Sequence, residues 1–112
     1  MDAVNRNIHL LLTAIQKSEV YRNYKKQEEI LEKNPELYAR VQQFRADNFC
    51  LQNEEKGNLL QAADHLAKES AELRRNPEVN AYLDAELALC KLMQGICKKL
   101  TSGIDLDIPD MQ

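Results

Sequence analysis

Asn34-Pro35-Glu36 and Asn76-Pro77-Glu78 are the same tripeptide, and each lies between two stretches whose apolar residues recur at helical spacing. Asparagine is a preferred N-cap because its side-chain oxygen accepts hydrogen bonds from the free amides of the first turn. Proline at the first helical position gives up only an N–H that would have had no partner. The residue before a proline is also pushed out of the α region, so the preceding helix ends there. The chain is therefore expected to consist of helices joined by short corners.

The apolar spacing on either side of these corners predicts about five helices in an all-α fold of helix-corner-helix repeats. The first helix is expected over residues 3–16, and Ser18 offers a cap for the second, although Lys17-Ser18 could equally be a kink. Gly57-Asn58 predicts the end of the third helix and the start of the fourth. The fifth helix is expected from Pro77 to about residue 102. We expect one helical domain over residues 1–103, followed by a short acidic tail over residues 104–112.

The third expected helix carries a heptad seam with one polar member. Its apolar positions alternate at spacings of four and three, and Asn48 takes one of them: Leu37, Val41, Phe44, Asn48 and Leu51. A lone asparagine in such a seam can set register or oligomeric state at some cost in stability. An irregular helix that turns Asn48 toward solvent explains the same pattern, so both interpretations stay open.

The fifth helix differs from the others in the middle, where apolar residues go most of the way round between Tyr82 and Cys97. A surface helix needs one apolar stripe, and this segment offers contacts on several sides. We therefore predict a long buried C-terminal helix that meets a second subunit, most simply in a two-fold dimer. In the alternative, the first four helices of the same chain cover the segment completely.

The composition and charge of the chain disfavour nucleic-acid-binding and membrane-inserted proteins. The chain has 112 residues, of which 44% are hydrophobic and 29% are charged, as in one globular domain. The net charge of −3 comes from interleaved acidic and basic residues, which disfavours direct binding to nucleic acid. No apolar run has the roughly 18 residues that cross a bilayer, and no secretory signal pattern stands at the N-terminus. We expect no membrane insertion and a cytoplasmic location.

The search for reactive groups predicts neither an enzyme nor a cofactor or metal site. The two histidines, His9 and His65, lie on different expected helices, and the pair His65 and Glu69 is typical of a solvated helix face. The three glycines are isolated, so no phosphate-binding loop is indicated. The three cysteines fit a reducing compartment, where they are expected to pack in a core or interface.

Two stretches of the sequence carry motifs of a known family. The first is Glu-Val-Tyr-Arg-Asn-Tyr-Lys-Lys from Glu19, followed by Asn-Pro-Glu-Leu-Tyr from Asn34 and Val-Gln-Gln-Phe-Arg ending at Arg45. The second runs from Glu72 through the second corner to Ala85-Glu86-Leu87, and the ending Ile104-Asp105-Leu106-Asp107 is similar as well. These stretches resemble the YlbF/YmcA family of small bacterial helical proteins. The resemblance covers nearly the whole chain, but its motifs contain no catalytic residues.

The resemblance implies a regulatory adaptor that pairs with itself or with related family subunits. Members of the family in Gram-positive bacteria are linked to competence, biofilm formation and sporulation, through a complex that influences RNA processing by a membrane-associated endoribonuclease. Some members of that complex hold an iron-sulfur cluster through cysteines. Here no cysteine follows Ser102, and the chain's three cysteines cannot complete a set of four thiolates in one copy, although two copies could.

We therefore predict a non-enzymatic protein-protein interaction module, as a homodimer or with related subunits. The resemblance also implies a ribonuclease-associated complex as a partner. The alternative is a redox or iron-sulfur sensor in which Cys90 and Cys97 of neighbouring subunits act together. Aromatic residues are enriched at interface hot spots, and the last helix supplies further contacts. The expected interface residues are Tyr38, Phe44, Asn48, Phe49, Leu89, Cys90, Met93 and Cys97.

Overall fold

The computed structural model describes residues 2–52 and 59–104, and these residues form five helices. The helices are α1 (Ala3–Lys17), α2 (Glu19–Glu32), α3 (Pro35–Gln52), α4 (Leu59–Leu73) and α5 (Pro77–Gly103). The all-α prediction is confirmed, and the helix bounds agree with the expected ones to within a residue or two where both ends are described. The expected break at Gly57-Asn58 lies outside the described residues.

Side-chain caps begin the helices at the expected places. The Oδ1 atom of Asn76 accepts from the backbone N–H groups of Glu78 at 2.8 Å and Val79 at 3.4 Å, and Asn34 accepts from the N–H of Leu37 at 3.3 Å. Ser18 has an extended backbone and accepts from the N–H of Tyr21 at 3.2 Å, so α1 and α2 are separate helices. The two Asn-Pro-Glu corners therefore start α3 and α5 through the same local chemistry.

The buried core lies where α2, α3, α4 and α5 converge. We call this cluster the junction, and it consists of Leu31, Val41, Leu73, Val79, Tyr82 and Leu83. Four of its side chains are fully buried, and α2 packs along the N-terminal half of α5. The helices thus meet at one end rather than along their whole lengths.

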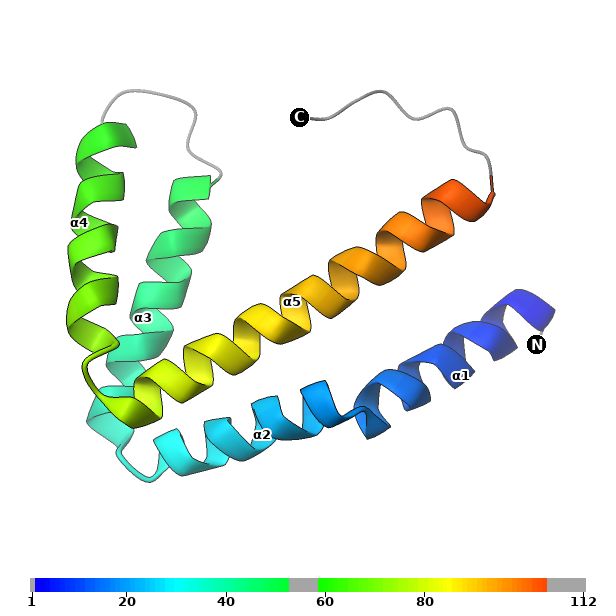
Figure 1. The fold of residues 1–112 in the computed structure, drawn as a ribbon, viewed down its shortest axis with the longest axis horizontal. Coiled ribbons are helices and arrows are strands. Elements are labelled where there is room, and N and C mark those ends of the chain that lie inside the picture. The colour runs from blue at the N-terminus through cyan, green and yellow to red at the C-terminus, as the bar shows by residue number, and fades with distance from the viewer. Residues whose placement is uncertain (1, 53–58, 105–112) are drawn as a thin grey trace.

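From the junction the helices spread in two directions, as Figure 1 shows. α3 and α4 form one pair, whereas α1 and the C-terminal half of α5 both extend to the other side of the molecule. The radius of gyration is 17.4 Å, compared with about 13 Å for a compact domain of this length. A single copy of the chain is therefore open in shape.

The burial of α5 ends partway along the helix. Its buried residues are Val79, Tyr82, Leu83 and Ala85, all in the first third. The C-terminal half is mostly exposed in a single chain, because α1 does not continue the packing that α2 makes on the first half. Helices α1 to α4 of the same chain thus cover the apolar segment between Tyr82 and Cys97 completely only in its first turn, and Leu87 and Met93 are exposed.

Candidate interaction surface

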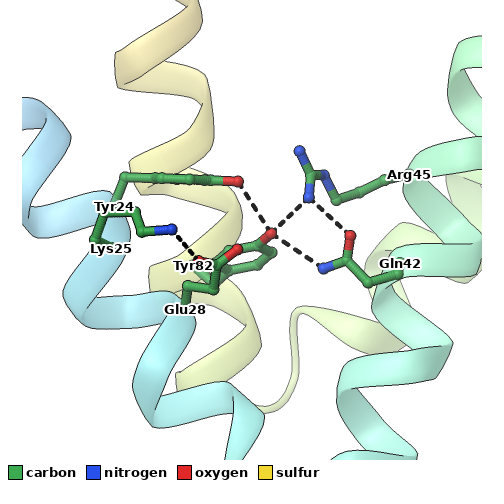
Figure 2. Close-up of polar contacts among 6 residues, drawn as sticks. All are labelled: Tyr24, Lys25, Glu28, Gln42, Arg45 and Tyr82. Atoms are coloured by element: carbon green, nitrogen blue, oxygen red, sulfur yellow. Dashed lines mark hydrogen bonds and ion pairs between the residues drawn. The ribbon is translucent and has the colours of Figure 1, made fainter. Parts of the chain in front are cut away.

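Tyr82 is the centre of a polar network inside the junction (Figure 2). Its hydroxyl oxygen accepts from Nη1 of Arg45 at 2.6 Å and from Nε2 of Gln42 at 3.1 Å, and it lies 3.3 Å from the hydroxyl of Tyr24. Arg45 also donates to Oε1 of Gln42 at 2.8 Å and pairs through Nε with the carboxylate of Glu86. The network joins α2, α3 and α5.

The hydrogen bonds of the Tyr82 hydroxyl are fully satisfied. Arg45 and Gln42 occupy both acceptor positions of the oxygen, so its proton points to Tyr24. Burial raises the pKa of Tyr82, and the hydrogen bond with Tyr24 raises it further. The ring stacks on Tyr24 with centroids 5.5 Å apart, and the Arg45 guanidinium lies 5.5 Å from the ring centre. A neutral, buried and fully bonded tyrosine is suited to fixing helices in place rather than to transferring a proton.

The second region consists of the two extended segments, and its main feature is exposed apolar surface. We define the arms as α1 together with residues 87–104, which include the C-terminal half of α5. Among the described side chains, nine of the ten exposed large hydrophobic residues lie on the arms: Val4, Ile8, Leu10, Leu11, Leu12, Leu87, Met93, Leu100 and Ile104. The tenth, Leu60, lies on α4. Such concentration is typical of an interaction site.

Both arms carry apolar residues at heptad spacing. On α5 the stripe that begins with buried Tyr82 and Ala85 continues through Leu89, Leu92 and Ile96, which are half-buried. On α1 the corresponding stripe is Val4, Ile8, Leu11 and Ile15, and the exposed fraction falls from 68% at Val4 to 36% at Leu11. Alternating spacings of three and four residues are those of helices that pack against other helices over several turns.

Charge is distributed unevenly between the arms and the rest of the chain. Residues 3–18 and 87–104 contain Arg6, Lys17, Lys91, Lys98 and Lys99 but no aspartate or glutamate. Residues 19–86 contain fourteen acidic and ten basic residues. The apolar arms are therefore basic, although the chain as a whole is acidic.

The expected interface residues fall in three places. Leu89 is half-buried on α5, and Cys90, Met93 and Cys97 are exposed on the same arm. Tyr38 and Phe44 are half-buried and already pack against the junction, and burial raises the pKa of Tyr38. Asn48 is exposed and lines a groove between α3, α4 and α5. The side chains of Phe49 and Cys50 lie outside the described residues.

The sequence patterns leave two features of the structure unpredicted. The first is the exposure of the large apolar side chains of α1, for which the absence of acidic residues across both arms is the available sequence signal. The Tyr82 network joins residues up to 58 positions apart, so no local pattern could have found it.

The other reactive groups are scattered. His9 and His65 are both exposed, and Glu69 pairs with Arg40 on α3 at 3.3 Å. Within the described residues, no three histidine, cysteine or acidic side chains gather where a metal ion could be held. Over the same residues, no helix combines the length and apolar character required to cross a bilayer.

Comparison with known proteins identifies a family. Residues 4–105 match the family model described as control of competence regulator ComK, YlbF/YmcA. A relative from Caldicellulosiruptor bescii, named UPF0342 protein, is 26% identical over 98 residues, which cover 85% of this chain and 82% of the relative. No solved structure matches the chain significantly.

Proposed function

Because this chain belongs to the YlbF/YmcA family, whose description is regulatory, we propose that it is a non-enzymatic cytoplasmic adaptor that self-associates through its arms. The observation that carries the proposal is the concentration of exposed large hydrophobic side chains on α1 and residues 87–104. Burying one such side chain completely lowers the free energy by about 1.5–3 kcal/mol relative to leaving it in water. Covering these side chains with a partner is therefore favourable.

A second copy of the chain is the partner that best matches the exposed apolar surface of the arms. Each copy contributes two helices with heptad stripes, and the four helices can form a bundle. In such a bundle the apolar side chains of one copy pack between those of the other. Two-fold association also uses the same surface on both partners, so one exposed patch satisfies two chains. The open shape and the uncovered second half of α5 support this arrangement.

Site-specific photo-crosslinking in the native host tests the proposal. A crosslinkable amino acid at Leu100, which is 56% exposed on an arm, should join the chain to a second copy of itself. The same amino acid at Leu60, which is 85% exposed on α4, is the matched control and should give no such product. A product only with a related family subunit or an endoribonuclease would replace self-association by pairing with another protein. Equal products from both positions would contradict an interface at the arms.

The alternative function is a cysteine-based sensor. Cys90 and Cys97 are both exposed on the same arm, so two associated copies would bring four thiols to one interface. Chain purified without oxygen should then absorb visible light, and the absorbance should disappear in the Cys90→Ser and Cys97→Ser double variant. Colourless protein whose regulatory activity survives both replacements would eliminate the sensor.

A further inference from the structure

The arms are basic and apolar, and the segment that follows them has the opposite charge and the same apolar character. Residues 105–112 read Asp-Leu-Asp-Ile-Pro-Asp-Met-Gln, with three aspartates between aliphatic residues and no basic residue. The arms carry five basic residues and no acidic one. We propose that residues 105–112 bind to the arms of their own chain and compete there with a second copy, an inference that rests on the proposed function.

Geometry allows the contact. The tail continues directly from Ile104 at the tip of α5, and the N-terminal end of α1 lies on the same side of the molecule (Figure 1). Eight residues in extended form span up to about 27 Å, and α1, with 15 residues, is about 22 Å long. The extended tail is therefore longer than α1, and it starts on the side of the molecule where α1 begins.

The acidic charge of residues 105–112 and their covalent link to α5 favour these residues as the segment that binds the arms. Lys98 and Lys99 stand about two turns before the tail begins, and Arg6 lies on the other arm. An attached segment also acts at an effective concentration in the millimolar range, so weak contacts suffice to occupy the surface. Leu106, Ile108 and Met111 would cover some of the apolar side chains that a second copy covers in the dimer. The tail thus sets the concentration at which the chain self-associates.

The first test removes the charge of the tail. The triple variant Asp105→Asn, Asp107→Asn, Asp110→Asn should lower the dimer dissociation constant about ten-fold at low salt, because the tail then competes less. The control Glu29→Gln, Glu32→Gln, Glu36→Gln removes the same charge from exposed positions of α2 and α3, and it should change the constant less than about two-fold. An equal change in both variants, no change, or a weaker dimer in the tail variant would overturn the proposal.

The second test separates the tail from self-association. A spin label at Met111→Cys, in a chain whose three cysteines are serine, should broaden the NMR signals of α1 amides within the labelled chain. In a mixture, labelled chains should leave the α1 amides of unlabelled isotope-enriched chains unbroadened. Absence of broadening, or broadening only in the mixture, would overturn binding within one chain. If no variant self-associates but the broadening is present, the proposed function and the competition fail, whereas binding of the tail to the arms of its own chain stands.

Discussion

α5 passes through two different surroundings along its length. Around Tyr82 its apolar residues are buried among α2, α3 and α4, and the Tyr82 hydroxyl has three polar partners. Beyond residue 86 the same heptad stripe continues, but its neighbours are exposed, and the charges change to basic only. One helix thus holds a small domain together with its first half and leaves large apolar side chains exposed along its second.

The junction and the arms also differ in how they use charged groups. Ion pairs tie elements together around the junction: Arg45 pairs with Glu86 between α3 and α5, and Arg74 reaches Asp84 across the second corner at 2.8 Å. Over the described residues, the ion pairs found involve none of the five basic residues of the arms. Partly exposed pairs contribute little stability each, and their value here is in orienting helices.

Replacing Tyr82 by alanine should break the junction most severely. The change removes a fully buried ring and a hydroxyl that holds three polar partners, so we expect a loss of about 3–5 kcal/mol in the free energy of unfolding. Leu100→Ala on the arm should change the unfolding of a single copy by less than about 0.5 kcal/mol. Urea unfolding at the lowest measurable protein concentration, where single copies predominate, gives the free energy of unfolding of both variants. Similar losses in both variants would erase the distinction between the regions.

Leu89 marks the boundary, because it is half-buried where the junction stripe passes into the arm. If a second copy completes its burial, Leu89→Ala should cost about 2–5 kcal/mol in the associated protein. Denaturation of the unaltered chain and the variant at a high and a low concentration provides the measurement. A cost below about half a kcal/mol at high concentration would place Leu89 outside the interface.

Alkaline pH should weaken the junction through Tyr82. An unfolded tyrosine loses its proton near pH 10, whereas burial and the Tyr24 hydrogen bond raise the pKa of folded Tyr82 above that value. The contribution of this group is therefore fully present below about pH 10 and is lost as pH rises toward the folded-state pKa, by up to about 1.4 kcal/mol per pH unit.

Tyr82→Phe is the control for this pH dependence. The variant keeps the ring and lacks the titrating hydroxyl, so its unfolding free energy should fall less steeply between about pH 10 and 11. Equal slopes for the unaltered chain and the variant would show that other groups cause the alkaline loss.

The smallest expected effect concerns the corner that starts α5. Asn76→Ala removes a cap that accepts two backbone hydrogen bonds, and it should cost about 1 kcal/mol. Asn34→Ala, where the cap accepts one longer bond, should cost less. Thermal melting of both variants ranks the corners, and an unaltered melting temperature for Asn76→Ala would mean that the cap does not stabilise the helix.

Helix starts could be predicted from the sequence because capping is local: Asn34, Asn76 and Ser18 each accept from amides two or three residues ahead. The exposure of the arms could not be predicted from the sequence. Apolar spacing on α1 predicts a stripe, but it does not show whether another helix of the chain covers that stripe. The prediction that α5 is buried was right for Tyr82 and Leu83, whereas Met93 and Cys97 are exposed in a single copy.

Sedimentation of the unaltered chain across nanomolar to micromolar concentrations tests the central claim most directly, that the arms are left open for a second copy. We expect dimers at micromolar concentration that dissociate on dilution. Leu100→Asp should shift the dissociation constant upward by at least ten-fold, because it buries a charge in the interface. Leu60→Asp should leave the constant unchanged. Single copies of the unaltered chain at every concentration up to the micromolar range would contradict the account.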